Sequence, residues 1–187
     1  MDKKAERKLQ RAQLLDLRES LADRTKREIA VQRRVADWLR QADVHSVGFY
    51  YPVRGEPDLR SVVAQWLSRD ARRIGALPVI SASADGPGLE YHGWTADSPM
   101  QAGVSGIPVP AHGRVLQPEC LLIPCVGFDH KRFRLGYGGG YFDRLLARVV
   151  PWPLAVGIAF ESTRVESIDP QPHDVQLDVI ITDVAQY

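Results

Sequence analysis

The sequence contains few cysteines and no long apolar run. Only Cys120 and Cys125 of its 187 residues are cysteines, which argues against the disulfide framework of a small secreted protein. No apolar segment approaches the roughly 20 residues that a membrane helix needs. The charged N-terminal stretch has no apolar signal-peptide core. We therefore expect no membrane partner and a location in the cytoplasm.

The chain also lacks a large net charge of either sign. Its 24 Lys and Arg residues offset 23 Asp and Glu residues, which leaves a net charge of +1 and no global field toward nucleic acid. Positive charge is concentrated in residues 1–40, with 12 of those 24 basic residues and 7 of the 23 acidic ones. This segment could face an anion, lie in solvent or form a nucleic-acid binding module. Trp38 is its only aromatic residue, and no recognised nucleic-acid module pattern accompanies it, so we expect no nucleic-acid partner.

Three helices are predicted. Residues 3–40 have no proline or glycine and carry apolar residues at helical spacing, which predicts a long N-terminal helix. Thr25 and Glu28 form a capping-box pattern that predicts a break near residues 23–25. Residues 57–69 predict a helix with Pro57 in its first turn. Another helix is expected over residues 140–149.

Apolar and β-branched runs between these helices predict strands. The runs cover residues 44–51, 74–80, 120–125, 154–160 and 177–182. Residues 81–118 are rich in Gly, Pro and Ser and predict one short strand, 89–94, in an otherwise irregular connection. Alternation of strands and helices implies an α/β fold over 1–187 as a single domain, with a mostly parallel or mixed sheet covered by helices on both faces. The loops after the strands would then meet at the edge where such sheets bind ligands.

The most informative segment is rich in glycine. Four glycines lie within Gly136–Gly140, after Arg134 and before Asp143. The bare N–H groups of such a loop form a concave anion site, and an arginine fork suits phosphate. An aspartate beside bound phosphate is a natural Mg²⁺ ligand. The segment therefore predicts a nucleotide or phosphate site.

Other interpretations of the glycines fit less well. A Walker loop needs GxxxxGK[ST], and no lysine followed by Ser or Thr occurs near them. A dinucleotide fingerprint needs glycines directly after a strand, whereas these begin eleven residues after Cys125. A tight turn without a ligand would explain the glycines but not the flanking Arg134, Asp143 and Arg144.

The segments Pro124–Asp129 and Arg134–Arg144 together resemble the signature of the 5-formyltetrahydrofolate cyclo-ligase family, also called methenyltetrahydrofolate synthetase. Weaker elements follow the family's order along essentially the whole chain: Arg11 to Arg18, Glu56, Gly106–Pro110 and His173–Asp174. The resemblance implies an enzyme that uses ATP and Mg²⁺ to convert 5-formyltetrahydrofolate into 5,10-methenyltetrahydrofolate, ADP and phosphate through a phosphorylated formyl intermediate. We expect a monomer. The alternative is a divergent nucleotide-binding paralogue without the folate reaction.

The resemblance also implies roles for individual residues. Arg134 and Tyr141 would be catalytic, and Asp143 and Asp174 would hold Mg²⁺. ATP would be bound by Arg7, Lys8, Arg11, Arg134, Leu135, Gly136, Tyr137, Gly138, Gly139, Gly140, Tyr141 and Phe142. The folate would contact Tyr51, Glu56, Tyr137, Gly138, Gly139, Gly140 and Tyr141.

Several of these residues also have an ordinary structural interpretation. Glu56 could be an exposed loop acid, Asp143 an acid in the first turn of a helix, and Asp174 the cap of a turn. Cys125 has no histidine partner and an apolar flank, so we interpret it as an inert core residue.

The sequence departs from the family pattern at three positions. Arg132 replaces a glycine, Phe142 a tyrosine and Leu59 a threonine, which affects the expected loop shape and substrate affinity. We further hypothesise that residues 81–118 close over the substrate, because a phosphorylated intermediate needs protection from water.

Overall fold

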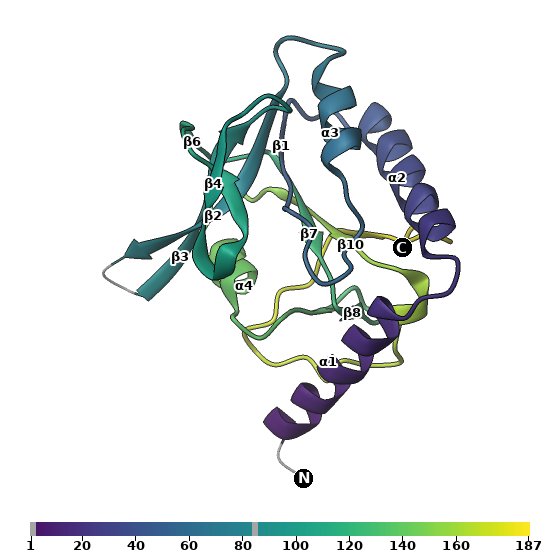
Figure 1. Ribbon diagram of the computed structural model, residues 1–187. Helices are drawn as coiled ribbons and strands as arrows, with labels where there is room; N and C mark the ends of the chain where they lie inside the picture. Colours follow the sequence, from purple (N-terminus) through teal and green to yellow (C-terminus); the bar gives the residue numbers. More distant parts are fainter. Residues whose placement is uncertain (1–2, 84–85) are drawn as a thin grey trace.

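A seven-stranded sheet forms the centre of the protein. The computed structural model describes residues 3–83 and 86–187, and Figure 1 shows their arrangement. The strand order is β11-β10-β7-β1-β2-β3-β6. The strands are β1 (Ser46–Gly48), β2 (Ile74–Ser83), β3 (Gly86–Trp94), β6 (Val115–Leu116), β7 (Cys120–Pro124), β10 (Leu154–Ile158) and β11 (Val179–Ile181). The five strands from β11 to β2 are parallel, whereas β3 and β6 each pair antiparallel.

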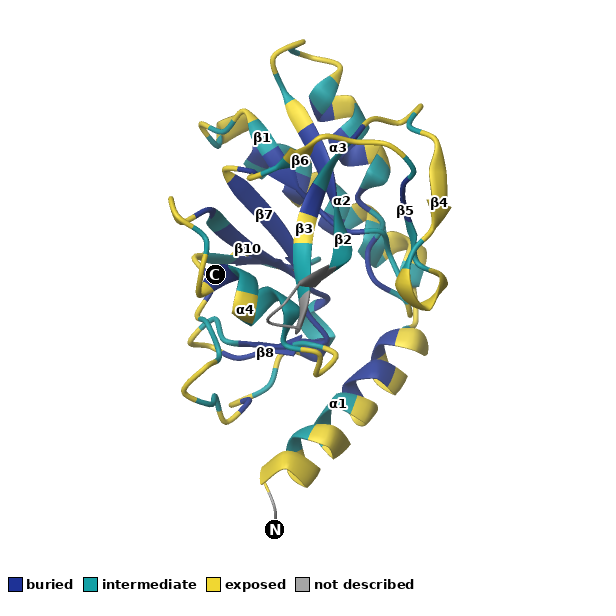
Figure 2. Cartoon of the chain, turned by 90° about the vertical axis from the view of Figure 1, so that its left-hand side faces the viewer, coloured by how far each residue is buried: buried dark blue, intermediate teal, exposed yellow. Residues whose placement is uncertain are grey.

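Helices cover both faces of this sheet, as the sequence predicted. The helices are α1 (Lys3–Glu19), α2 (Arg24–Gln41), α3 (Arg60–Leu67) and α4 (Tyr141–Leu146), with single 3₁₀ turns η1 (Val104–Gly106) and η2 (Glu161–Thr163). Successive residues of β7 point to opposite faces. Leu122 packs in the cluster of α2 and α3, while Leu121 packs in the cluster of α4. Both faces are therefore buried, and Figure 2 shows β7 and β10 as buried strands.

Helix α1 lies against the loops that follow the central strands. Leu14, Leu15 and Arg18 form its buried side. The two leucines pack in a small cluster with Val126 and Leu135. Because α1 is mostly exposed on its other side (Figure 2), its position depends on this narrow contact.

The helix boundaries differ in part from the predicted ones. A break between α1 and α2 is present, but the capping box is wrong: Asp23 is the N-cap of α2, with φ 53° and no side-chain cap. Glu28 instead accepts the main-chain N–H of Asp58 at 2.8 Å. Helix α3 begins at Arg60 rather than near Pro57, because the Asp58 carboxylate accepts the Arg60 N–H at 3.0 Å and holds a turn there.

The segment 81–118 is more regular than predicted. Strand β3 is longer than expected and pairs along β2, and β4 (Met100–Ala102) pairs with β5 (Pro108–Pro110). Strand β6 extends the main sheet. Strands β4, β5 and β6 have only two or three residues each, too few to show a side-chain periodicity. Residues 84–85 of the segment lie outside the described part of the chain.

The loop after β7 explains the departure at Arg132. Strands β8 (Gly127–Phe128) and β9 (Arg134–Leu135) pair antiparallel, and the chain between them turns with Arg132 at φ 61°. Glycine adopts this left-handed conformation without steric cost. Arg132 donates through Nε to the Leu177 carbonyl at 3.1 Å, and its own carbonyl accepts the Leu177 N–H at 3.0 Å. The side chain thus gains a bond in a backbone conformation that favours glycine.

We predict that Arg132→Gly is more stable than Arg132→Ala by about 1 kcal/mol, because both variants lose the side-chain bond but only alanine keeps the strain. Urea unfolding of the two variants measures this difference. Lys131 provides the control, because its φ is not positive. Here Lys131→Gly should be less stable than Lys131→Ala. An Arg132→Ala variant as stable as Arg132→Gly would contradict the prediction.

Candidate active site

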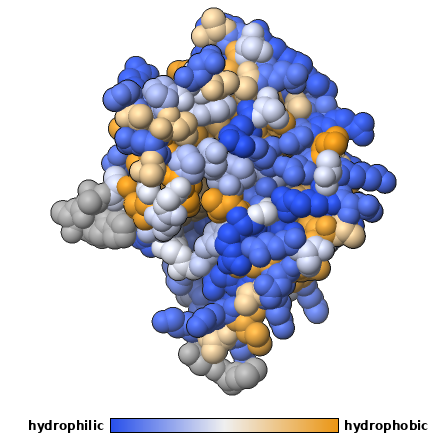
Figure 3. Space-filling view, viewed as in Figure 1, coloured by the Kyte–Doolittle hydropathy of each residue, from blue (hydrophilic) through white to orange (hydrophobic). Residues whose placement is uncertain are grey.

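A cleft of about 1320 Å³ opens between α1 and the carboxyl ends of the parallel strands. The loop after β1, the end of β7 and the glycine segment Gly136–Gly140 line it, together with residues of β2, β3 and β5. The cleft is thus at the sheet edge where α/β folds bind ligands. Figure 3 shows apolar residues gathered beside hydrophilic ones on this face.

The predicted site residues lie around this one cleft, with one exception. The lining includes Arg7, Lys8, Arg11, Tyr51, Glu56, Arg134, Gly136, Tyr137, Gly138, Gly139, Gly140, Tyr141, Phe142, Asp143 and Asp174. Leu135 is fully buried in the core beside Leu14 and Leu15. Its side chain anchors the loop, so any contact with a ligand would have to be made by its main chain.

The glycine loop is shaped by left-handed residues and by α1. Gly138 and Gly140 have φ of 97° and 64°, which favours glycine. Arg11 donates through Nε to the Gly136 carbonyl at 2.6 Å. A Cβ on Gly138 would lie 3.4 Å from Cζ of Arg11, so the helix and the loop are in close contact. Burial lowers the pKa of Arg11, and the charge of Arg7 adds to this shift.

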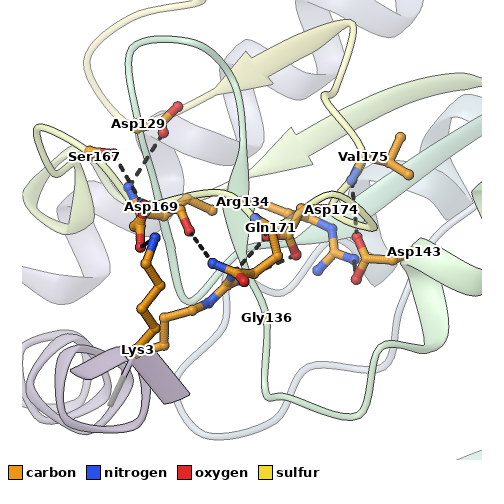
Figure 4. Close-up of polar contacts among 12 residues, drawn as sticks. Lys3, Asp129, Arg134, Gly136, Asp143, Ser167, Asp169, Gln171, Asp174 and Val175 are labelled. Carbon is orange, nitrogen blue, oxygen red and sulfur yellow. Dashed lines mark hydrogen bonds and ion pairs between the residues drawn. The ribbon is translucent and has the colours of Figure 1, made fainter. Parts of the chain in front are cut away.

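Two arginine–aspartate pairs close the predicted phosphate end of the cleft. Arg134 donates to Asp143 at 2.9 Å, and both side chains are largely buried. Arg7 donates to both oxygens of Asp174, at 2.6 and 3.2 Å. Figure 4 shows Arg134 and Asp143 beside Asp174, and the Val175 N–H donates to Asp143 at 3.4 Å. Within the described chain, no group accepts a hydrogen bond from the buried Nε of Arg134.

The arginines therefore neutralise both predicted metal ligands in the free protein. Burial would raise the pKa of Asp174, but the Arg7 guanidinium and the Gln171 N–H outweigh it and lower that pKa below its usual 3.8. In the part of the chain that the structure describes, no three His, Cys, Asp or Glu side chains gather as a metal site. A divalent ion held by Asp143 and Asp174 would need its other ligands from a phosphate or from water.

Glu56 is a buried acid, so its interpretation as an exposed loop residue is wrong. Its exposed fraction is 4%. It accepts the Tyr137 hydroxyl at 2.7 Å on one oxygen and the Val53 N–H at 2.9 Å on the other. Burial raises the pKa of Glu56, while these two donors and the charge of Arg18 oppose that rise.

Arg18 is a residue that the sequence reasoning missed. It is 1% exposed and donates to the Tyr137 hydroxyl and to the carbonyls of Arg54 and Cys125. Its position three and four residues after Leu15 and Leu14 was a usable signal, because that spacing places it on the buried face of α1.

Aromatic and apolar groups also line the cleft. Tyr51 accepts a bond from Arg60 at 3.0 Å, and that guanidinium lies over the Tyr51 ring. Tyr141 lies beside Arg144, and Phe142 beside Arg134. An apolar wall that was not predicted consists of Pro78, Ile80, Leu89, Val104, Ile107 and Val109. Leu59, by contrast, is a fully buried core residue, so this departure from the family pattern does not lie in the cleft.

Comparison with known proteins identifies the family of this chain. The model of the 5-formyltetrahydrofolate cyclo-ligase family matches residues 3–183. The chain belongs to this family. Membership and the class of enzyme are thus confirmed, and the remaining question is how this cyclo-ligase family member uses its cleft.

The relatives carry the same name. A Mycoplasma pneumoniae 5-formyltetrahydrofolate cyclo-ligase is 43% identical over 67 residues, which span 36% of this chain and only 40% of that protein. A Haemophilus influenzae 5-formyltetrahydrofolate cyclo-ligase is 27% identical over 82% of this chain and 84% of its own. The solved structure of Aquifex aeolicus 5,10-methenyltetrahydrofolate synthetase has a TM-score of 0.77 at 26% identity, covering 96% of this chain and 91% of that one. The predicted fold class is therefore confirmed. None of the described helices of this family member has the length and apolar character to span a bilayer.

We predict that the Arg7–Asp174 pair loses its stabilising effect in acid. Because the folded-state pKa of Asp174 lies below its usual 3.8, the contribution is present above that value and is lost as pH falls through the folded-state pKa. The difference in free energy of unfolding between wild type and Asp174→Asn should shrink from about pH 6 to about pH 3. Chemical denaturation across this range measures it.

Asp169→Asn provides the control, because Asp169 pairs with Lys3 on the surface and exposed pairs contribute little. A wild-type advantage over Asp174→Asn that stays constant across the range would contradict the prediction.

Proposed function

We propose that this family member uses ATP and Mg²⁺ to convert 5-formyltetrahydrofolate into 5,10-methenyltetrahydrofolate, ADP and phosphate. One observation carries the proposal: a single cleft joins a glycine loop crowded with cations to a buried carboxylate and an apolar wall. The glycine loop with its cations suits a triphosphate, whereas the buried carboxylate and the apolar wall suit a reduced pterin. A monomer in the cytoplasm, with no nucleic-acid or membrane partner, completes the proposal.

The glycine loop and α1 would bind the nucleotide. Main-chain N–H groups of Gly136–Gly140 would face the phosphates. Arg134 and Arg11 are already held against the loop, and Arg7 and Lys8 line the same end of the cleft. Fixed cations at this position stabilise the charge that develops during phosphoryl transfer.

Asp143 and Asp174 fit a magnesium ion that is bound together with the nucleotide. Both carboxylates line the cleft beside the glycine loop, and Mg²⁺ commonly takes one or two carboxylates together with phosphate oxygens. When bound, the ion would neutralise phosphate charge. In the free protein Arg134 and Arg7 occupy the two carboxylates, so these arginines would exchange an aspartate for a phosphate on binding.

The folate would occupy the other half of the cleft. Glu56 would accept N–H groups of the pterin edge, and the ring of Tyr141 would stack on the substrate near the reacting formyl group. Ile80, Leu89 and Ile107 would cover the apolar part. Since Val104, Ser105 and Ile107 lie in 81–118 and line the cleft, this segment would also exclude water from the reaction, as hypothesised.

The reaction needs positioning more than a protein nucleophile. The formyl oxygen attacks the γ-phosphorus, the bond to the bridging oxygen breaks and ADP leaves. N10 then attacks the formyl carbon, the C–O bond breaks, and inorganic phosphate leaves with the former formyl oxygen, while N10 loses its proton. Arg134 would be catalytic by holding the transferring phosphoryl group, and the cleft would hold N10 close to the formyl carbon.

We predict that ¹⁸O placed in the formyl oxygen appears in the inorganic phosphate, because that oxygen leaves with the phosphoryl group. Mass spectrometry of the released phosphate measures the label, and a sample without ATP controls for exchange with water. Unlabelled phosphate beside complete conversion to methenyltetrahydrofolate would exclude the phosphorylated formyl intermediate.

We predict that Asp143→Asn lowers turnover at least about a hundredfold, because the amide lacks the anionic oxygen that would hold Mg²⁺ beside the phosphates, while circular dichroism shows an unchanged fold. Asp37→Asn is the matched control, because it removes an exposed carboxylate that pairs with Arg40 on α2, and neither residue lines the cleft. Near-normal rates of Asp143→Asn at limiting Mg²⁺ would rule out the metal assignment. Binding of ATP without any folate conversion by the wild type would favour the divergent paralogue.

A further inference from the structure

Arg18 is a buried cation to which the proposed reaction assigns no role. The guanidinium donates to oxygens on three separate segments: the Arg54 carbonyl at 3.1 Å, the Cys125 carbonyl at 3.2 Å and the Tyr137 hydroxyl. It also lies 5.6 Å from the centroid of the Tyr137 ring. A buried charge is costly unless hydrogen bonds satisfy it, and these acceptors come from the loop after β1, the loop after β7 and the glycine loop.

The hydrogen bond from Arg18 to Tyr137 determines the direction of the hydrogen bond between Tyr137 and Glu56. A guanidinium can only donate, so the Tyr137 oxygen must accept from Arg18. The one hydroxyl proton is then donated to Oε1 of Glu56, at 2.7 Å.

The second oxygen of Glu56 is also an acceptor. The main-chain N–H of Val53 donates to Oε2 at 2.9 Å. With both oxygens accepting bonds, Glu56 has the bonding pattern of an ionised carboxylate, and its remaining lone pairs are available to a ligand in the cleft that it lines.

The other groups around Glu56 do not replace Arg18. Tyr50 and Cys125 are buried beside it, and burial raises the pKa of both, to about 12 for the thiol, so both are neutral at neutral pH. Arg24 of α2 donates to the main-chain carbonyls of Glu56 and Arg18, at 3.3 and 3.4 Å, and none of its hydrogen bonds in the described chain reaches the Glu56 carboxylate. Within the side-chain network around this carboxylate, Arg18 supplies the positive charge.

We infer that Arg18 is a positioning residue of the folate site: by donating to the Tyr137 hydroxyl, it holds Glu56 as a carboxylate that accepts N–H groups of the ligand. The identity of the ligand rests on the proposed function. The hydrogen-bond chain itself belongs to the free protein, so the inference can be tested with and without folate.

Infrared difference spectroscopy of the free protein is the first test. Subtracting the spectrum of Glu56→Gln isolates the bands of Glu56, in the wild type and in an Arg18→Met background. At neutral pH we expect the carboxylate bands of Glu56 in the wild type and the protonated carboxyl bands of Glu56 in Arg18→Met. An Arg24→Met background is the matched control and should keep the carboxylate. Carboxylate bands in all three backgrounds, or a protonated acid in all three, would overturn the inference.

Calorimetric titration with 5-formyltetrahydrofolate is the second test. We expect Arg18→Met and Tyr137→Phe each to weaken binding about tenfold, the effect of losing one charge-assisted hydrogen bond. If Arg18 acts through the hydroxyl, the double variant should also be weakened only about tenfold. Additive losses of about a hundredfold, or equal weakening in Arg24→Met, would overturn the inference.

Two further results distinguish a failure of this inference from a failure of the proposed function and from a variant that does not fold. A wild type that binds no folate would contradict the proposed function, while the infrared spectra would still decide the role of Arg18. If Arg18→Met does not fold, Arg18→Gln replaces it in both tests. Its amide can still donate hydrogen bonds but carries no charge. Wild-type spectra and wild-type folate affinity in Arg18→Gln would overturn the inference.

Discussion

The contact between helix α1 and the glycine loop is the constraint on which the rest of the cleft depends. Arg11 holds the Gly136 carbonyl from one side of the loop, and Arg18 holds the Tyr137 hydroxyl next to it. Leu14 and Leu15 anchor the same helix against Leu135, the buried last residue of β9, which directly precedes the glycine loop. If α1 moved away, the cleft would lose its basic wall, and the glycine loop would lose its support at the same time.

The cleft keeps its charges paired before any ligand arrives. Arg134 with Asp143 and Arg7 with Asp174 form two close pairs at the end that we assign to the phosphates. Such pairs hold long side chains in place at low net charge, so the site is ordered without a bound anion. Under the proposed function, a nucleotide with its metal would bring both signs of charge and would take over both members of each pair. Binding of the metal and the nucleotide together would then be favoured over binding of either alone.

The features that were predictable from the sequence are those with a local chemical signature. The apolar run Cys120–Pro124 is a parallel strand buried on both faces, and the glycines at 136–140 lie in the cleft beside Arg134. The short strands β4, β5 and β6 were not predictable, because two or three residues are too few to show a side-chain pattern. Glu56 was uncertain because only the fold decides whether a loop acid is buried. Its roles, like those of the other cleft residues, stay predictions.

We propose that the nucleotide end and the folate end of this cleft act on one reaction. The absorbance of methenyltetrahydrofolate tests this when purified protein is mixed with 5-formyltetrahydrofolate and Mg²⁺, with and without ATP. We expect a rise in absorbance that requires ATP. No rise from a folded protein that binds ATP would contradict it.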